Sequence, residues 1–298
     1  MAAAALLSSV PLTARPVVAT LSHSAAAAHA AALREQGFTV LADPVVEASL
    51  VSKAAVEVAS TLDGLLDEVG EAGFDPIDQQ YLFHEVCYRQ EGRWDVRLPS
   101  ANEAPAWAEV CETARAAAVA PILAALQGSE SGELETLMSG AIVSRAAPAQ
   151  RPHADADLEQ YEIGEEDDTY RTFSCFIPLV DLHGSGGDGT QFWPGSHVSA
   201  AAAEAAWERA TADGWEELLE LSPGAAGAEA PACRAGGVVL YDSRTIHGGL
   251  PSRGRTRAIA YLIVGTGGAQ DSNFPPERIR DGLDPDEFPY WDELDFVQ

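Results

Sequence analysis

The sequence is almost without lysine. Lys53 is the single one among 298 residues, so arginine supplies nearly all of the positive charge. Acidic residues outnumber basic ones by 46 to 18, which gives a formal net charge of −28. Such a chain repels a phosphate backbone, and we expect no nucleic-acid partner. Any carboxylate that the protein binds should be held by arginine, whose planar guanidinium fits it.

Cysteine is scarce as well, and no CxxC pair occurs, so neither a disulfide framework nor a structural zinc site is expected. Buried free thiols are the default for Cys87, Cys111, Cys175 and Cys233. No apolar stretch is long enough to cross a bilayer, and we expect no membrane partner. The phosphate-binding patterns GxGxxG and GxxxxGK[ST] are also absent, so a nucleotide site is not indicated.

The N-terminal segment contains no acidic residue before Glu35 and is rich in alanine and serine, with Arg15 among them. This composition is typical of an organellar transit peptide and equally of a disordered leader. We therefore expect residues 1–22 to be a flexible leader or a transit segment, and the protein to be cytoplasmic or organellar. Residues 23–298 should form a single domain.

The pattern of apolar residues changes near position 137. Before it, helical spacing predicts helices over residues 25–36, 46–69 and 106–120, with a strand at 38–41. After it, short apolar runs between turns predict strands at 141–144, 171–179, 189–192, 237–241 and 257–264, with a helix over 199–221. We divide the domain into a helical part (23–136), a barrel core (137–266) and an acidic tail (267–298). Helices followed by short strands indicate a mainly β barrel or sandwich with flanking helices.

The first candidate for chemistry is the run Arg151-Pro152-His153-Ala154-Asp155. On an extended chain, side chains two residues apart point the same way. His153 and Asp155 can therefore offer an imidazole nitrogen and a carboxylate oxygen to one metal ion. The pair alone is a weak signal, because so short a motif also arises by chance in surface loops.

Two residues far downstream strengthen the case for this pair. A glycine-led strand over residues 236–242 leads to His247, and Arg257 comes ten residues later. Two histidines and one carboxylate, with the other metal positions open, form the ligand set of non-haem Fe(II) oxygenases. A 2-oxo acid can take two of the open positions and O₂ the last. The far carboxylate of that acid needs a partner that is always charged and binds it through two N–H groups, and arginine meets both needs.

The order of these motifs resembles that of the phytanoyl-CoA dioxygenase family of Fe(II)/2-oxoglutarate oxygenases. The N-terminal stretch over residues 33–41 also resembles the opening of that family, so the resemblance covers most of the chain. The most telling matching piece, between the two ligand motifs, is Pro194-Gly195-Ser196-His197. The other pieces are residues 153–155, 176–181, 189–193, 236–242, 247–249 and Arg257.

The resemblance implies a double-stranded β-helix, a jelly-roll or cupin-like barrel with the metal in its mouth. It implies Fe(II) held by His153, Asp155 and His247, and 2-oxoglutarate held by an arginine near position 257. The expected reaction couples decarboxylation of 2-oxoglutarate to succinate and CO₂ with oxidation by O₂, usually hydroxylation, of a small organic molecule. An acyl-CoA carries phosphates and would want a basic rim, and the chain shows no basic cluster except around residues 253–257 and at Arg93 and Arg97. The substrate that names the family is therefore not expected.

Two arginines compete for the carboxylate. Arg255 and Arg257 share a strand face, and either could reach it. We prefer Arg257, because it directly precedes the apolar strand, as the family's arginine does. The charged face of the alternating run over residues 93–97 could contact substrate, but the expectation is a salt-bridged face toward solvent. Hydroxyls on predicted barrel strands that could bind the 2-oxo acid are Ser144, Thr172 and Ser174.

Two other functions stay open on this reasoning. A metal-dependent barrel enzyme could use the same ligands without 2-oxoglutarate, leaving Arg255 and Arg257 as surface or substrate contacts. A non-catalytic barrel that binds a ligand is the second, and the complete set of His153, Asp155 and His247 argues against it. Asp155 also disfavours halogenation, because halogenases that resemble this family replace the metal carboxylate with a small residue. The sequence names no protein partner.

Overall fold

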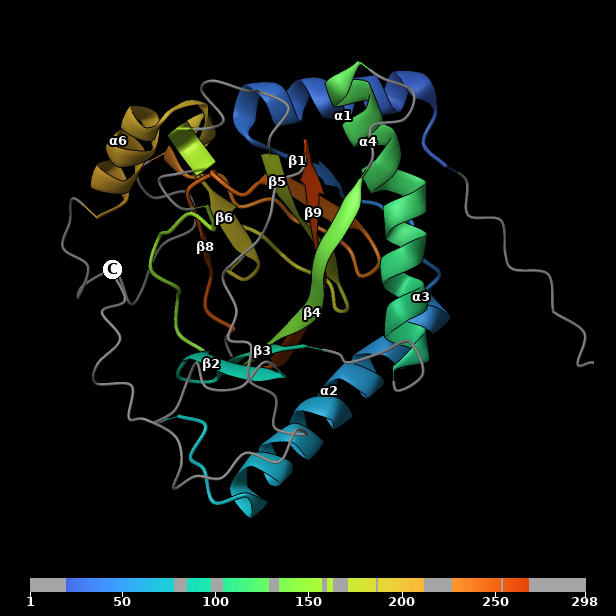
Figure 1. The fold of residues 1–298 in the computed structure, drawn as a ribbon, viewed down its shortest axis with the longest axis vertical. Coiled ribbons are helices and arrows are strands. Elements are labelled where there is room, and N and C mark those ends of the chain that lie inside the picture. The colour runs from blue at the N-terminus through green and yellow to red at the C-terminus, as the bar shows by residue number, and fades with distance from the viewer. Residues whose placement is uncertain are drawn as a thin grey trace, which may run out of the picture.

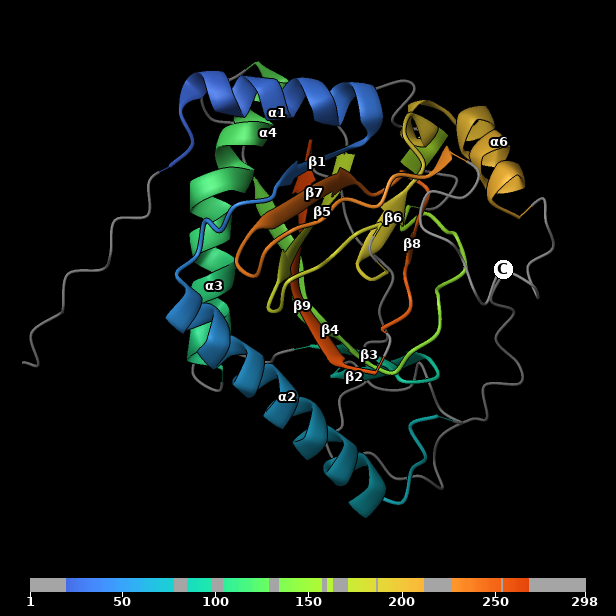
Figure 2. The ribbon, with the colours of Figure 1, turned by 180° about the vertical axis from the view of Figure 1, so that it is seen from behind.

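The protein is built around a sheet of seven antiparallel strands, with helices on one face and a two-stranded sheet on the other (Figures 1 and 2). This is the fold of a computed structural model, whose described residues are 20–77, 85–97, 104–128, 134–156, 160–162, 171–185, 187–211, 227–252 and 254–267.

The large sheet has the strand order β1-β7-β5-β9-β4-β3-β2, and the small sheet pairs β6 with β8. The longest contact joins β4 to β9, which pair from Glu135 with Gly265 to Arg145 with Thr256. The strands of the large sheet are β1 (Phe38–Leu41), β2 (Val86–Gln90), β3 (Arg93–Val96), β4 (Glu135–Arg145), β5 (Arg171–Pro178), β7 (Val238–Asp242) and β9 (Thr256–Thr266). Those of the small sheet are β6 (Thr190–Phe192) and β8 (His247–Gly249).

The helices form because the sequence supplies their ends and their buried faces. Ser22 caps the first helix by accepting a hydrogen bond from the Ala25 N–H, and Gly37 ends it in the left-handed conformation. Pro121 cannot donate a backbone hydrogen bond, and just before it the helix widens into one π turn, Arg115–Val119. The helices are α1 (His23–Gln36), α2 (Ala48–Glu71), α3 (Pro105–Ala114), α4 (Ala120–Gln127) and α6 (Ala200–Thr211).

Alternation along each strand divides the core in two. On β4, Ala141 and Val143 face the helices and join a cluster with Leu62 of α2 and Val110 of α3. The opposite faces of the strands look into the space between the two sheets. There Phe192 of β6 stacks on Phe38 of β1, with ring centroids 4.7 Å apart. The rest of this inner cluster comprises Met138, Phe176, Leu182, Cys233, Val239, Tyr241, Ile259 and Tyr261.

The architecture confirms the predicted fold class, a mainly β jelly roll with flanking helices. The portion expected to be helical, residues 23–136, nevertheless contributes three strands of the large sheet, β1 to β3. The helix expected over 199–221 ends at Thr211, beyond which its residues lie outside the described ones. All four cysteines are buried and free, as expected. No helix among the described residues is long and apolar enough to cross a membrane.

The expectation for residues 93–97 is wrong. Arg93, Asp95 and Arg97 are 1%, 4% and 7% exposed, and they face the space between the sheets rather than solvent. The reason is that this face of β3 has polar partners in the interior. Arg93 donates to Ser144 Oγ and to the carbonyls of Pro148 and Leu250, and Asp95 accepts from Arg89 and from the Tyr261 hydroxyl.

The turn between α1 and β1 predicts a stability difference between two glycines. Gly37 has φ +86°, and a Cβ there would lie 2.5 Å from Thr245 Oγ1 and 2.6 Å from His197 Nδ1. Gly73 has the same φ, with no atom within 4 Å. Gly73→Ala should therefore cost about 1–2 kcal/mol of left-handed strain. Gly37→Ala should cost about 1–3 kcal/mol more, because overpacking is added.

Urea unfolding of both variants measures the two costs. Equal losses for Gly37→Ala and Gly73→Ala would contradict the close packing of Gly37 against the loop that precedes His247.

Candidate metal centre

Backbone pairing places the two candidate histidines side by side. His153 and His247 form an isolated antiparallel bridge, with N–H···O distances of 2.9 and 2.8 Å in the two directions. The segment before His153 continues this pairing, because the Gln150 N–H donates to the Gly249 carbonyl at 2.7 Å. The Asp155 N–H donates to the Ser243 carbonyl at 2.9 Å, which anchors the carboxylate residue to the loop after β7.

The side chains of these three residues converge. Asp155 Oδ1 lies 3.7 Å from the Nε2 atom of His153 and 3.7 Å from that of His247. One ligand atom from each residue lies within 4.8 Å of the others, so His153, Asp155 and His247 could together hold a metal ion. Sequence reasoning identifies all three, and the fold brings them together across almost a hundred residues.

Hydrogen bonds fix which imidazole nitrogen is free. His153 Nδ1 lies 2.8 Å from the Arg151 carbonyl, and His247 Nδ1 lies 3.0 Å from the Thr245 carbonyl. A carbonyl can only accept, so each Nδ1 carries the proton and donates it. Each Nε2 then presents its lone pair toward Asp155, which is the tautomer that metal ligation requires.

The electrostatics keep His153 and Asp155 in their ligating forms at neutral pH. Burial, and then the neighbouring His247, lower the pKa of His153 to about 4, although a third of its side chain reaches solvent. Burial alone would raise the pKa of Asp155. The charges of His247 and His153 and the Tyr241 hydroxyl outweigh it, and that pKa lies below its ordinary value. At pH 7 the histidine is neutral and the carboxylate ionised, as metal binding needs.

A second polar site lies at one end of the same interior. Arg93 of β3, Ser144 of β4 and Arg257 of β9 sit in register on adjacent strands. Ser144 Oγ is 3.3 Å from Arg93 Nε and 3.4 Å from Arg257 Nη2. The other hydrogen bonds of the two guanidinium groups go to the backbone carbonyls of Pro148, Gly189 and Leu250.

This arginine pair carries positive charge that no described carboxylate neutralises through a hydrogen bond. Arg93 and Arg257 are 1% and 2% exposed. Among the described residues, Arg93 Nη1 and Arg257 Nε have no hydrogen-bond partner. Burial and the nearby Arg257 lower the pKa of Arg93 to about 9, and burial lowers that of Arg257 to about 10. Buried charge of one sign is costly unless an anion is present, so the pair suits a carboxylate.

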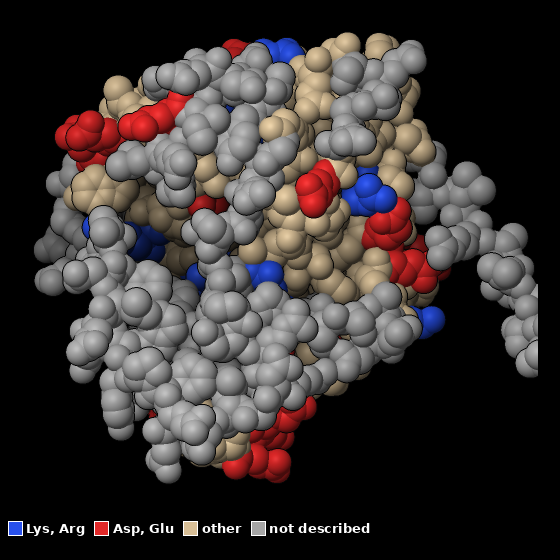
Figure 3. Space-filling model, in the orientation of Figure 1, with Lys and Arg blue, Asp and Glu red and all other residues tan. Residues whose placement is uncertain are grey.

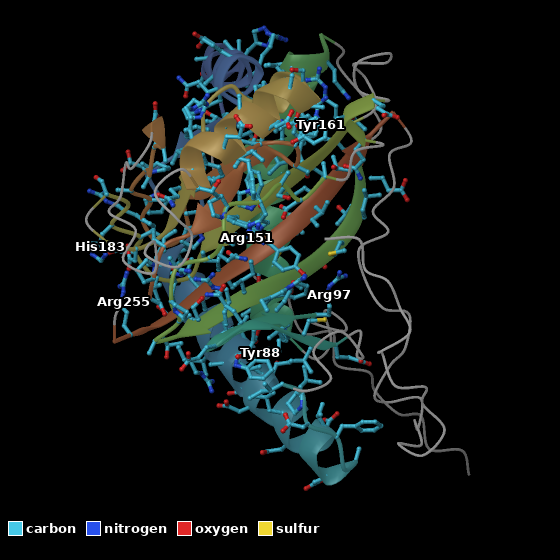
Figure 4. The ribbon with its side chains drawn as sticks, turned by 90° about the vertical axis from the view of Figure 1, so that its left-hand side faces the viewer. Tyr88, Arg97, Arg151, Tyr161, His183 and Arg255 are labelled. Atoms are coloured by element: carbon cyan, nitrogen blue, oxygen red, sulfur yellow. The ribbon has the colours of Figure 1, made fainter. Side chains whose placement is uncertain are left out.

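Arg255, the other candidate, is engaged elsewhere. Its guanidinium pairs with Asp188, and it also contacts the Asp181 carbonyl and His183 Nδ1. In Figure 4, Arg255 and His183 lie together at one margin, away from Arg151, which precedes the ligand segment. Arg255 therefore closes a surface loop onto the start of β9, whereas Arg257 faces the interior.

Sequence reasoning misses two further residues of the site. It predicts Arg93 on a solvent face, because a strand that alternates charged and apolar residues gives the same pattern whichever face is buried. It places Tyr241 only in an apolar strand, yet the Tyr241 hydroxyl donates to Asp155 Oδ2 at 2.8 Å. Ser174, expected to bind the 2-oxo acid, donates to the same oxygen at 3.2 Å. For Tyr241 and Ser174, the available sequence signal of such a role is a hydroxyl in an otherwise apolar strand.

The surface around the centre differs from the acidic average of the chain. Figure 3 shows a recess with basic side chains inside it, on the side of α6, while acidic side chains gather at the outer margins. At the described rim, Arg151 stacks over the Trp207 ring of α6 at 5.4 Å from its centroid. Arg89 is held by Asp95 at 2.6 Å, and its positive charge helps to lower the pKa of both His153 and Asp155.

A jelly roll that carries a two-histidine, one-carboxylate centre and a buried arginine pair is the arrangement of an Fe(II)- and 2-oxoglutarate-dependent oxygenase. The family model described as phytanoyl-CoA dioxygenase (PhyH) matches residues 33–259, and the chain belongs to this family. This confirms the resemblance drawn from the sequence. No match to a curated protein was found.

Solved structures are similar to the chain in fold. The epimerase SnoN, in complex with Fe3+, alpha ketoglutarate and nogalamycin RO, has a TM-score of 0.54 at 16% identity over 82% of this chain and 85% of SnoN. AviO1 from Streptomyces viridochromogenes Tue57 has a TM-score of 0.53 at 18% sequence identity, over 84% of this chain and 98% of AviO1. HygX from Streptomyces hygroscopicus, with nickel and 2-oxoglutarate bound, has a TM-score of 0.50 at 14% sequence identity, over 82% of this chain and 88% of HygX.

The geometry predicts which histidine the metal requires. His153→Ala should remove one of three ligand atoms and weaken Fe(II) binding by about 100-fold or more, on the order of one lost metal contact. His183→Ala is the matched control, because that histidine lies at the surface beside Arg255 and outside the ligand cluster. Anaerobic equilibrium dialysis measures both. Equal iron binding in wild type and His153→Ala would contradict the assigned centre.

Proposed function

We propose that this protein oxidises a small organic molecule, by hydroxylation, while converting 2-oxoglutarate and O₂ to succinate and CO₂. The observation that carries the proposal is the coexistence of two sites in one interior. One is the convergent set of His153, Asp155 and His247, and the other is the buried pair of Arg93 and Arg257. A dicarboxylic acid with a 2-oxo group at one end has a chemical partner at each.

His153, Asp155 and His247 would hold the Fe(II), which supplies the activation of O₂ and the binding of the 2-oxo acid when present. The two neutral imidazoles and the single carboxylate leave the ion a net positive charge, which favours an anionic co-substrate. The Nδ1–H bonds to backbone carbonyls keep both rings aimed at the ion, so little reorganisation is needed on binding.

Arg257 and Arg93 would bind the far carboxylate of 2-oxoglutarate. Arg257 Nε and Arg93 Nη1, without partners among the described residues, are the donors that such a carboxylate would satisfy. The approach of Arg93 depends on Gly249, because a Cβ at that position would lie 3.1 Å from Arg93 Nη2. The short strand β8 thus serves the metal site at His247 and leaves room for the arginine at Gly249.

Aromatic side chains would exclude water from the reacting centre. Phe192 and Tyr241 both pack on His247, with ring centroids 6.0 and 4.7 Å from its imidazole. Phe176 packs edge-on against Tyr241 at 5.1 Å. A wall of this kind keeps a reactive oxidant away from solvent and limits its escape from the substrate.

The two alternatives fit less well. A barrel enzyme that does not use 2-oxoglutarate would leave Arg93 and Arg257 buried with no carboxylate hydrogen-bonded to them among the described residues, which is energetically unfavourable. A non-catalytic barrel has no use for a complete ligand set in its ligating tautomers.

SnoN has been solved with nogalamycin RO, so a small organic molecule fits within this fold, and we propose the same class of substrate here. Whether the protein acts in the cytoplasm or in an organelle stays a sequence-based proposal.

Release of labelled CO₂ from 2-oxoglutarate labelled at its first carbon tests the reaction type. Purified protein with Fe(II), ascorbate and O₂ should release it slowly without substrate and faster with one. Protein loaded with Zn(II) in place of Fe(II) is the control and should release none. Iron-bound protein that never consumes 2-oxoglutarate would favour the alternative barrel enzyme.

The arginine pair predicts a selective effect on the co-substrate. Arg257→Ala should raise the 2-oxoglutarate concentration at half-saturation at least about 30-fold, because truncating one partner of a buried charge pair costs about 2–5 kcal/mol. Arg255→Ala should change it less than about threefold, because that side chain pairs with Asp188 near the surface. The measurement is CO₂ release against 2-oxoglutarate concentration. The opposite ranking would mean that Arg255, not Arg257, binds the co-substrate.

A further inference from the structure

The two carboxylate oxygens of Asp155 have different surroundings. Oδ1 faces the two histidine Nε2 atoms, each at 3.7 Å. Oδ2 accepts hydrogen bonds from the Tyr241 hydroxyl at 2.8 Å and from the Ser174 hydroxyl at 3.2 Å. One oxygen is thus directed at the metal position, and the other is occupied by two protein donors.

Both donors are rigidly held. Ser174 on β5 and Tyr241 on β7 are direct neighbours in the sheet register. Tyr241 is fully buried, and its ring is in contact with Phe176, Phe192 and His247. Ser174 is 2% exposed. Both hydroxyls are buried, and without Asp155 each would keep only a longer contact. Ser174 Oγ lies 3.4 Å from Ser243 Oγ, and the Tyr241 oxygen lies 3.4 Å from His247 Nε2.

We propose that Tyr241 and Ser174 are positioning residues that make Asp155 a one-oxygen ligand, by keeping its second oxygen away from the metal. This inference rests on the proposed metal centre and deepens it. A carboxylate can bind a metal through one oxygen or through both. If Asp155 used both, it would take one of the open positions that the 2-oxo acid and O₂ need. The two hydroxyls would therefore keep coordination positions open for the 2-oxo acid and O₂, in addition to orienting a metal ligand.

The hydrogen bond of the Tyr241 hydroxyl favours this role over direct ligation. It lies 3.4 Å from His247 Nε2, beyond its 2.8 Å bond to Asp155 Oδ2. The shorter contact is the one that a phenol makes as a donor to a carboxylate. Direct ligation would need a phenolate, and it would consume an open position instead of preserving one.

The chain offers a matched control for the tyrosine. Tyr261 lies in the same inner cluster, is also buried, and donates its hydroxyl at 2.8 Å to a carboxylate, that of Asp95. Asp95 is not among the metal-ligating residues. Tyr261→Phe therefore removes the same atom from the same kind of environment, takes no hydrogen bond from the three candidate ligands, and leaves the Asp95 oxygen that holds Arg89 unchanged.

Anaerobic titration with Co(II) tests the proposal, because the visible absorption of Co(II) reports its coordination number as well as its affinity. We compare wild type, Tyr241→Phe, Ser174→Ala, the double variant and Tyr261→Phe, and then add 2-oxoglutarate to each Co(II) complex. The double variant should bind Co(II) about 10–100-fold more weakly, the usual effect of removing groups that orient a metal ligand. Its Co(II) spectrum should change, and 2-oxoglutarate should bind its Co(II) form more weakly. Tyr261→Phe should match wild type.

The outcomes separate the two proposals. If wild type binds no Co(II), the metal centre itself is wrong. If wild type binds Co(II) and the double variant matches it in affinity, spectrum and 2-oxoglutarate binding, the positioning role is overturned. A strong visible band of the Fe(III) form that disappears in Tyr241→Phe would also overturn it, because that band marks a phenolate ligand. If the double variant does not unfold cooperatively, it is not properly folded, and Tyr241→Phe alone then tests the positioning role. We expect Tyr241→Phe to lower the Co(II) affinity by about fivefold or more.

Discussion

The backbone pairing of His153 with His247 is the contact on which the site depends. It joins a segment between β4 and β5 to the short strand β8, and it sets two imidazoles 4.4 Å apart between ring centroids. The same pairing brings Gln150 against Gly249. Because Gly249 has no side chain, Arg93 can approach the backbone there. A one-residue slip would turn one ligand away from the interior, because side chains alternate along a strand.

Opposite charges are separated along the interior in a way that suits a molecule with two polar ends. Asp155 lies at the candidate metal centre, where two histidines and two hydroxyl donors surround it. Arg93 and Arg257 lie farther along the interior, beside Gly249 and Leu250, where their hydrogen bonds go to backbone carbonyls and the Ser144 hydroxyl. The chain is acidic as a whole, yet Arg93 and Arg257 concentrate positive charge in its interior. Recognition here comes from local desolvated charge, and the net charge of −28 says little about it.

The candidate site residues are predictable because their types and order are restrictive. The motifs alone single out His153, Asp155, His247 and Arg257 as candidates, since few side chains can ligate iron or bind a carboxylate. The elements α1, β1 and α2 were also found within a few residues, because their apolar spacing and the glycine at position 37 mark them clearly.

The features that the sequence hid depend on contacts between distant strands. The inward face of β3 could not be read from alternation, which is why Arg93 was missed. β8 spans only three residues, too few for a periodic signal, and it exists because β6 pairs with it. Tyr241 and Ser174 acquire their role from the register of β5 with β7 and from the path of the segment after β4. A local pattern can mark such a hydroxyl, but it does not give the contacts that these residues make with distant strands.

Anaerobic titration of the protein with Fe(II) and then with 2-oxoglutarate tests the central claim most directly. A 2-oxo acid chelated to Fe(II) gives a visible charge-transfer band that neither component gives alone. We predict that the band appears only when both are present, and that succinate, which lacks the 2-oxo group, does not produce it. Iron binding without such a band at saturating 2-oxoglutarate would contradict the assignment of this interior as a 2-oxoglutarate site.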